Sequence, residues 1–218
     1  PSRNQSMSFQ DRIQGALYGM FIGDALAMPV HWYYDTEALQ IDYGEVKHYL
    51  KPRNPHPDSN LRRSSYPPPS GIKDILHEQR QYWGQTGIHY HQFLQAGENT
   101  LNLKLARELL LFLQENGGYS AEAWLKRMVT FLTTPGNHND TYVEEYLRHF
   151  FTAYAQKRPI TECGRRDEKH IGGLSLILPL IIFFAQDPDY CKQLSQRHLA
   201  LTHGGRTMDV WGKFISSV

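Results

Sequence analysis

Cysteine is scarce in this sequence, because only Cys163 and Cys191 occur among its 218 residues. Two thiols in a chain of this size do not make a disulfide framework, so we expect both to be free in a reducing environment. The net charge is only +1, which gives no reason to expect a nucleic-acid partner or a membrane-surface partner. Together these absences predict an intracellular protein, with the cytoplasm as the expected compartment.

Long hydrophobic runs are also missing. The most apolar segment, residues 173–185, is interrupted by Pro179 and is shorter than the roughly 20 residues that span a bilayer. It therefore predicts a buried core helix and no membrane partner. The sequence shows no N-terminal signal-peptide pattern. It also has no P-loop, no Gly-x-Ser-x-Gly elbow and no Cys-x-x-Cys pair, so it carries no motif for the common chemistries that use them.

Helical periodicity is the main pattern that the sequence does have. Leu101, Leu105, Leu109 and Leu113 step by four residues, which places them on one helical face. No run alternates convincingly with period two. The pattern predicts an all-α fold with one domain over residues 9–218. We expect helices at about residues 9–27, 98–116, 120–132, 140–158, 173–185, 188–201 and 207–218, with Asp140 or Thr141 as a cap at the start of the fourth.

Several apolar side chains of the later helices are expected to face the core. Tyr142, Tyr146, Phe150 and Tyr154 step by four and are interpreted as a core stripe. The residues expected to face inward from the last two helices are Tyr190, Leu194, Leu201, Val210, Trp211 and Phe214. The eleven histidines lack metal-ligand spacing, so we expect most of them at the surface.

Two stretches do not look helical. Residues 1–8 are polar and are expected to be a disordered leader. Residues 43–71 contain six prolines, which remove amide donors and restrict their neighbours, so an irregular loop is expected. Loops of this length are often functional or mobile, and Arg62 and Arg63 could recruit a partner, although a solvated loop is the simpler interpretation. The chain starts without methionine and stops inside a helical pattern, so we expect it to be part of a longer protein.

Residues 13–32 form the most distinctive segment, a helix-like stretch rich in small residues. Gly15, Gly19 and Gly23 recur every four residues and share one helical face. Glycine inside a helix costs roughly 1 kcal/mol relative to alanine. We therefore expect another element to approach the backbone of this helix closely.

Three segments, taken in order, resemble motifs of the ADP-ribosylglycohydrolase family. Residues 23–27 read Gly-Asp-Ala-Leu-Ala, where that family typically has Gly-Asp-Ala-Leu-Gly. Residues 97–100 read Gly-Glu-Asn-Thr, where the family typically has Thr-Asp-Asp-Thr at the head of a helix. Residues 170–173 read His-Ile-Gly-Gly and are followed by Pro179 and by Thr-His at 202–203, similar to the Gly-Asn-Gly, proline-containing helix and Thr-His pair of the family. The resemblance covers about residues 12–218 and implies the orthogonal multi-helix fold of that family.

The resemblance also implies a chemistry. Family enzymes hold two divalent cations, usually Mg²⁺, because hard cations prefer oxygen ligands, and these metals orient the ribose and a water for hydrolysis. It implies metal ligation by Glu98, Asn99 and Thr100, and catalytic roles for Glu98, His31 and Asp24. It implies an ADP-ribose or ADP-ribosylated partner, contacted by His170, Gly172, Gly173 and His203.

The family pattern is degraded at several of these positions. Asn99 is neutral where the family has its second aspartate, and His31 stands where the family often has a glutamate. Ile171 and Leu176 replace an asparagine and an arginine of the third motif. The C-terminal aspartate cluster that completes the metal pair in the family has no counterpart before Val218, so it either lies beyond the end of this sequence or is absent.

Each of these residues also has a purely structural interpretation. Asp24 could bond a neighbouring helix end, and His31 could pack among the aromatic residues that follow it. Residues 98–100 could be only a helix amino terminus, where a carboxylate and a cap residue are favoured. Residues 172–173 could bind a phosphate through exposed amides or form a plain turn, and His203 could lie in a helix C-cap region or contact a ligand.

Two functions therefore remain open from the sequence. The first is metal-assisted hydrolysis of an N- or O-glycosidic ADP-ribosyl bond, as the resemblance implies. The second is a non-catalytic protein of the same fold, either crystallin-like and structural or a pseudoenzyme that binds a nucleotide. The degraded metal motif fits the second better than a standard hydrolase.

Overall fold

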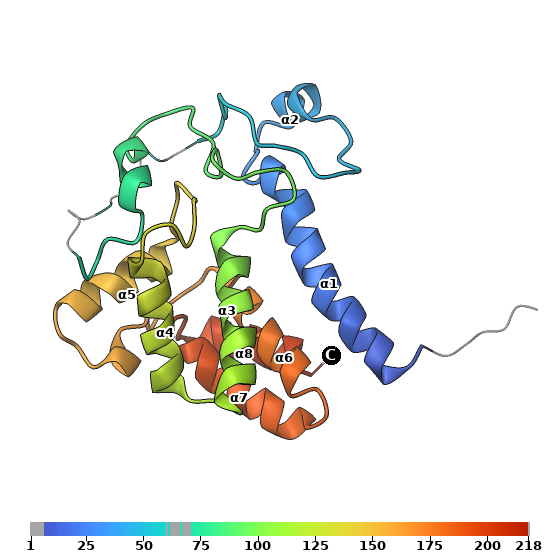
Figure 1. Cartoon of the computed structure of the whole chain (residues 1–218), viewed down its shortest axis with the longest axis vertical. Helices are drawn as coiled ribbons and strands as arrows, with labels where there is room; N and C mark the ends of the chain where they lie inside the picture. Colours follow the sequence, from blue (N-terminus) through green and yellow to red (C-terminus); the bar gives the residue numbers. More distant parts are fainter. Residues whose placement is uncertain (1–6, 60, 62–65, 67–70, 218) are drawn as a thin grey trace, which may run out of the picture.

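The computed structural model describes residues 7–59, 61, 66 and 71–217. Among these residues the fold is all-α (Figure 1), with no strand and only an isolated bridge between Arg165 and His203. The predicted fold class is therefore confirmed. The α-helices are α1 (Phe9–Ala27), α2 (Thr36–Asp42), α3 (Leu101–Asn116), α4 (Ala121–Thr133), α5 (Glu145–Ala155), α6 (Leu178–Phe183), α7 (Pro188–Ala200) and α8 (Arg206–Ile215). The short 3-10 helices are η1 (Met28–Val30), η2 (His77–Tyr82), η3 (Ile160–Glu162) and η4 (Ile171–Leu176).

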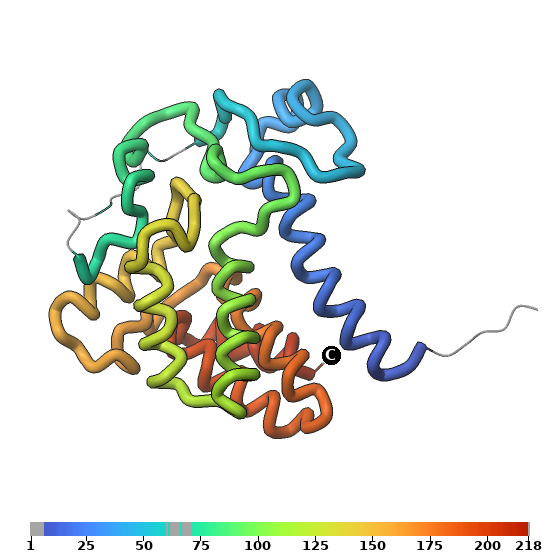
Figure 2. Tube along the Cα trace, in the orientation of Figure 1, coloured from blue at the N-terminus to red at the C-terminus, as the bar shows by residue number. Residues whose placement is uncertain are grey.

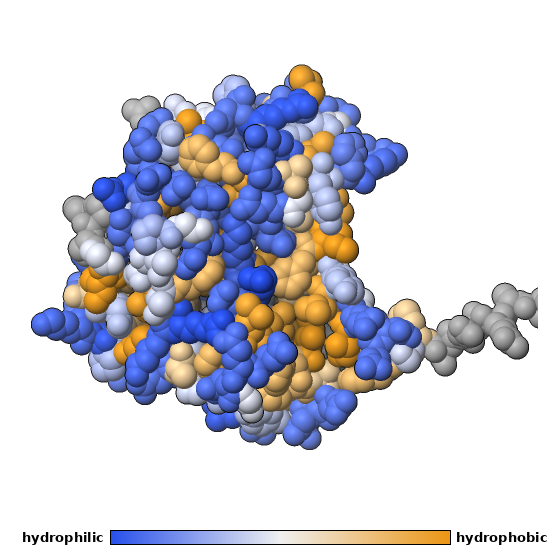
Figure 3. Space-filling view, viewed as in Figure 1, coloured by the Kyte–Doolittle hydropathy of each residue, from blue (hydrophilic) through white to orange (hydrophobic). Residues whose placement is uncertain are grey.

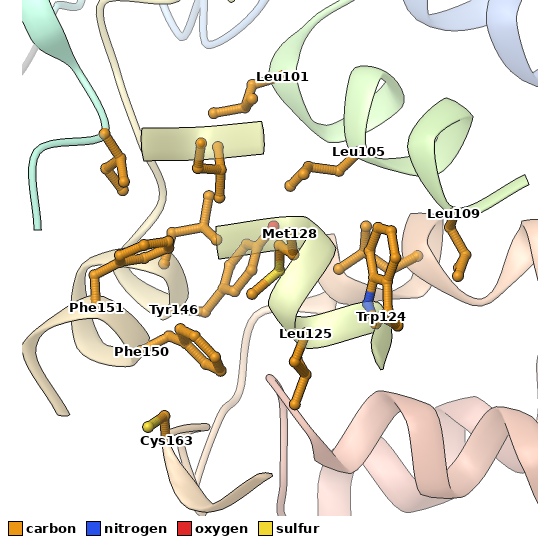
Figure 4. Packing of buried hydrophobic residues seen from close by; sticks show 14 of the residues in the cluster. Leu101, Leu105, Leu109, Trp124, Leu125, Met128, Tyr146, Phe150, Phe151 and Cys163 are labelled. Atoms are coloured by element: carbon orange, nitrogen blue, oxygen red, sulfur yellow. The ribbon is translucent and has the colours of Figure 1, made fainter. Parts of the chain in front are cut away.

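Helix α3 lies in the middle of the molecule, in contact with α4 on one side and α6 on the other (Figure 2). Its predicted leucine face is buried, with Leu105 and Leu109 fully inaccessible. These leucines belong to one cluster with Trp124 of α4 and with Tyr146 and Phe150 of α5 (Figure 4). The core therefore sits below the amino-terminal end of α3 and leaves that end beside the loops.

Several helix ends agree with their sequence signals. Ser120 caps α4 by accepting the N–H of Ala123, and α3 ends at Gly117 in the left-handed conformation.

Ser8 forms a capping box with Asp11 at the start of α1. The predicted leader is therefore wrong at Ser8, because this residue is bonded into a helix, and residues 1–6 lie outside the described residues.

Two helix boundaries differ from the prediction. α5 begins at Glu145, because the carboxylate of Asp140 bonds α3 and a histidine instead of capping α5. The helix predicted at 173–185 is two pieces, η4 and α6. Pro179 lies in the first turn of α6, where its missing N–H removes no intrahelical hydrogen bond.

The inward face of α8 was predicted wrongly. Four of the residues expected to face the core from α7 and α8 are exposed, namely Tyr190, Val210, Trp211 and Phe214. The buried face of α8 instead carries Met208 and Gly212. Gly212 permits this packing because a Cβ there would already lie 3.1 Å from the side chain of Leu199 on α7. A glycine carries little weight in a hydrophobic pattern, so the sequence pointed to the bulkier face.

The glycine face of α1 is open, in contrast to the close approach that we expected. A Cβ at Gly15, Gly19 or Gly23 would meet no atom within 4 Å among the described residues. Apolar side chains, among them exposed Tyr18 and Ile22, lie along this helix on the molecular surface (Figure 3). By length and composition Phe9–Val30 is the one described segment that could cross a membrane, and a single such segment near the N-terminus is weak evidence for a span.

Histidines were expected mostly at the surface, and this prediction is wrong. Six are buried: His56, His89, His91, His138, His198 and His203. Three of these rings bond backbone groups of the irregular segments, whose N–H and C=O groups have no partner within a helix. In His56, His89 and His138 the Nδ1 atom accepts the N–H two residues later, and the Nε2 atom bonds a distant carbonyl.

The region between α2 and α3 contains no α-helix among the described residues and is held in part by these histidine rings. His56 bonds the carbonyl of His31 at 2.9 Å, and His89 bonds that of Pro29 at 2.8 Å. The described part of the predicted 43–71 loop contains no α-helix, as expected, and Arg62 and Arg63 lie outside the described residues. The effect is to fix the loops above the amino-terminal end of α3.

Candidate functional site

Two carboxylates meet at the amino-terminal end of α3. Asp24 of α1 accepts the N–H of Thr100 at 2.8 Å and its hydroxyl at 2.7 Å. Asp140 accepts the N–H of Leu101 at 2.6 Å. Carboxylates are favoured here because the first N–H groups of a helix have no intrahelical acceptor and carry partial positive charge. This is the structural role that the sequence left open for Asp24.

The residues implied as metal ligands do not turn toward a common point. Glu98 pairs with Lys104 at 2.7 Å, and its other oxygen accepts a backbone N–H. Asn99 and Thr100 both donate to Asp24. Among the described residues no group of three or more His, Cys, Asp or Glu could hold a metal ion. The arrangement does not fit Mg²⁺, because the charge of Glu98 is balanced by Lys104 and the Asp24 oxygens are already bonded.

A chain of three polar side chains runs from the buried interior to a cavity. Asp140 Oδ1 lies 2.5 Å from His91 Nδ1, and His91 Nε2 lies 2.8 Å from His31 Nδ1. Burial raises the pKa of Asp140, but the neighbouring His91 and its hydrogen bond to Asp140 lower this pKa by more than burial raises it. The pKa of Asp140 is therefore below its usual value. Burial and the neighbouring His91 lower the pKa of His31 to about 4. At neutral pH the imidazole of His31, at the cavity end of these three side chains, is therefore uncharged.

Glu144, the N-cap residue of α5, lines the same cavity as His31. Its Oε1 accepts a hydrogen bond from Asn102 at 2.5 Å. Burial raises the pKa of Glu144, and the hydrogen bond from Asn102 only partly offsets this effect. A carboxyl with a raised pKa retains its proton to higher pH and can donate it.

Two cavities adjoin at this point. The smaller, of about 190 Å³, is lined by His31, His91, Asp140 and Glu144 together with the first residues of α3. The larger, of about 360 Å³, is lined by residues around Glu144 and by the start of η4. The two share three walls, which are Trp32, Tyr142 and Glu144. These three side chains therefore mark where the two cavities border one another.

Aromatic rings form the shared wall. The rings of Trp32 and Tyr142 meet edge to face with centroids 4.6 Å apart, and Trp83 stacks on Tyr142 at 5.5 Å. The guanidinium of Arg148 lies over the Trp83 and Tyr142 rings. Trp32 has a φ of +64°, an uncommon conformation for a bulky residue and typical of positions that the surroundings hold in place.

The third motif divides between the larger cavity and the core. His170 and Gly172 line the cavity. Gly173 and His203 are buried behind it, and a Cβ at Gly173 would lie 2.5 Å from the His203 ring. The ring of His203 packs against Tyr146 with centroids 4.1 Å apart. The structure thus brings His31, Glu144, His170 and Gly172 to one surface, whereas Asp24 and Glu98 bond other protein groups.

Sequence reasoning missed four residues of this site. Asp140 was interpreted as a cap for α5, and Tyr142 as part of a core stripe that in fact begins at Tyr146. Glu144 and His91 were not singled out. Asp140 follows Asn139 and precedes the aromatic residue Tyr142 by two positions, which was a usable signal of a site residue. The sequence holds no such signal for His91, because only the fold brings it to Asp140 and His31.

Comparison with models of known protein families gives a match that covers nearly the whole chain. The family model described as ADP-ribosylglycohydrolase matches residues 5–215 of the 218-residue chain. No curated protein matches the sequence.

Proposed function

Because this chain belongs to the ADP-ribosylglycohydrolase family, we propose that it binds an ADP-ribosyl group and hydrolyses its glycosidic bond. The family supports a hydrolase function in general terms. The particular observation behind the proposal is the pair of adjoining cavities that share Trp32, Tyr142 and Glu144. They combine aromatic walls with a carboxyl group and an imidazole, which are side chains that act as general acids and bases.

The sizes of the cavities favour a divided ligand. The larger cavity, of about 360 Å³, lies within the range of roughly 300–1,000 Å³ that is typical of ligand pockets. The smaller, of about 190 Å³, has room for only part of such a ligand. We place the scissile ribose in the smaller cavity beside His31 and Glu144, and the rest of the nucleotide in the larger one beside His170 and Gly172.

The chemistry assigned to these residues is acid–base chemistry. Glu144, with its raised pKa, donates a proton to the departing atom as the bond to the anomeric carbon breaks. Trp32 and Tyr142 orient the ligand and exclude water from the rest of the cavity. Magnesium remains a prediction from the family, and no step is assigned to it, because Glu98, Asn99 and Thr100 bond Lys104 and Asp24.

One observation favours the non-catalytic alternative. The oxygens of Glu98, which the resemblance implies as metal ligands, and those of Asp24, which it implies as catalytic, are satisfied by protein groups. A protein that only binds ADP-ribose, or a crystallin-like structural protein, needs no metal site. It needs only a stable fold, which these hydrogen bonds support.

The deciding experiment is calorimetric titration of the chain with ADP-ribose, paired with a hydrolysis assay on ADP-ribosylated arginine and serine peptides. Wild type and a Trp32→Ala variant are compared, and Trp211→Ala serves as the control because Trp211 is exposed on α8. Binding that Trp32→Ala weakens at least tenfold, with release of ADP-ribose from a peptide, supports the proposal. Binding without release supports the pseudoenzyme, and no binding at millimolar ADP-ribose supports the structural protein.

A further inference from the structure

We propose that Asp140, His91 and His31 form a proton relay, and that His31 Nε2 accepts the proton of the water that attacks the ADP-ribosyl group. This inference rests on the proposed function, because it names the base of that reaction. None of the three relay members is a residue that the family resemblance implies as a metal ligand, and two of them, Asp140 and His91, carry no role in that resemblance.

The hydrogen positions follow from the order of the contacts. The lowered pKa of Asp140 keeps its carboxylate ionised, so it has only acceptors to offer. His91 Nδ1, at 2.5 Å, must then donate to it. In a neutral imidazole the other nitrogen accepts, so His91 Nε2 accepts the hydrogen of His31 Nδ1 at 2.8 Å. This leaves the lone pair of His31 Nε2 for the cavity that His31 lines.

One added proton converts this arrangement into a second stable one. When His31 Nε2 takes a proton, the hydrogen on His31 Nδ1 passes to His91 Nε2. His91 is then an imidazolium that bonds the Asp140 carboxylate, and His31 is neutral again with its hydrogen on Nε2. The positive charge thus ends beside a buried negative charge rather than on His31, where burial would oppose it.

Each member of the relay is held by a separate buried histidine. His56 bonds the backbone carbonyl of His31, His89 accepts the backbone N–H of His91, and His138 accepts that of Asp140. Burial lowers the pKa of these three rings, so they stay neutral and keep their acceptor atoms. The titratable groups that face His31 are His56, His89, His91, Asp140, Tyr142 and Glu144.

The reaction then balances within the site. A water proton passes to His31 Nε2 while the water oxygen bonds the anomeric carbon. The bond from that carbon to the departing atom breaks, its electron pair stays with the departing atom, and Glu144 supplies the proton that this atom needs. The site is left with a protonated relay and an ionised Glu144, and exchange of one proton with solvent restores both.

The first test is histidine nitrogen NMR of the whole chain at pH 7. We expect His31 to carry its hydrogen on Nδ1, which is the less common tautomer of free histidine, and we expect His91 to carry its hydrogen on Nδ1 and to accept at Nε2. A hydrogen on Nε2 of either ring at pH 7 overturns the relay. This measurement needs no substrate, so failure of the proposed function does not hide its result.

The second test compares His31→Gln and His91→Gln with His48→Gln, which is an exposed control. In His91→Gln the new side-chain amide retains a donor for Asp140 and an acceptor for His31 but cannot carry a proton. We expect kcat to fall about 10²–10⁴-fold in His31→Gln and about tenfold or more in His91→Gln, with the ADP-ribose Kd within about threefold of wild type. An unchanged kcat in His31→Gln overturns the relay. If the wild-type chain does not bind ADP-ribose, the proposed function itself is overturned.

Discussion

Asp140 and Leu101 are joined by a 2.6 Å hydrogen bond from the backbone N–H at the start of α3 to a fully buried carboxylate. Because the second oxygen of Asp140 accepts from His91, one side chain fixes both the helix that carries the core and the relay that opens into the cavity. The stability of the fold and the geometry of the site are therefore coupled at this residue.

The first prediction is that Asp140 contributes to stability in two separable amounts. Asp140→Ala leaves both the Leu101 N–H and the His91 ring without an acceptor, so the free energy of unfolding should fall by about 3–5 kcal/mol. Asp140→Asn offers only one acceptor oxygen and should lose about 1–3 kcal/mol. Urea unfolding measures both, with exposed Asp209→Asn as the control. Equal stability of Asp140→Asn and wild type would contradict the structure.

The sequence predicted the fold well wherever a helix carries its own signals. The bounds of α1 and the cap of α4 followed from residues inside or next to each helix. The face of α8 could not be predicted, because it depends on the fit of Gly212 against Leu199. The start of α5 was misplaced because Asp140 has the identity of a cap, and only tertiary contacts show that it bonds a different helix.

The candidate site was less predictable than the fold. The resemblance brought His31, His170 and Gly172 into consideration, and the structure places all three at adjoining cavities. It also pointed to Glu98, whose partner Lys104 lies six residues later on the next helical turns. His91 reached the site through loop geometry alone, and a single sequence holds no periodicity that reports on such a contact.

The second prediction separates glycines that a fold needs from those that it tolerates. Gly15→Ala meets open space inside α1, so helix propensity should stabilise the chain by about 0.5–1 kcal/mol. Gly173→Ala places a Cβ 2.5 Å from the His203 ring and should destabilise it by about 1–3 kcal/mol. Thermal unfolding of both variants tests this pair. Destabilisation by Gly15→Ala would show that another molecule or segment does approach that face of α1.

The third prediction concerns the metal. Glu98 forms an ion pair with Lys104 and does not join other possible metal ligands. A chelator should therefore leave the ADP-ribose affinity unchanged, and Glu98→Gln should change this affinity less than about twofold. The partly buried Glu98–Lys104 pair makes Glu98→Gln cost about 1 kcal/mol of stability at most. Calorimetric titration with and without chelator or added Mg²⁺ measures the effect. A tenfold or greater dependence of affinity on Mg²⁺ would restore the metal site that the resemblance implies.

The fourth prediction is a steep loss of stability in mild acid. Burial lowers the pKa of His89 and His198 to about 3 and of His203 to about 4. In the unfolded chain a histidine titrates near 6.5. Between these values the unfolded chain binds protons that the folded chain does not, so stability is complete above about pH 6.5 and falls as the pH drops toward 4.

The size of the effect can be assigned to one ring. Each such histidine adds about 1.4 kcal/mol of lost stability per pH unit within this window, and three together should unfold a domain of ordinary stability near pH 5. His198, whose Nδ1 lies 2.8 Å from the Tyr119 hydroxyl, is tested by His198→Gln, with exposed His48→Gln as the control. Between pH 8 and pH 5 the free energy of unfolding should fall less steeply in His198→Gln than in wild type. The difference in slope should correspond to about one bound proton fewer. An unchanged slope would mean that the pKa of His198 is the same in the folded chain as in the unfolded chain, which would contradict the lowering of this pKa by burial.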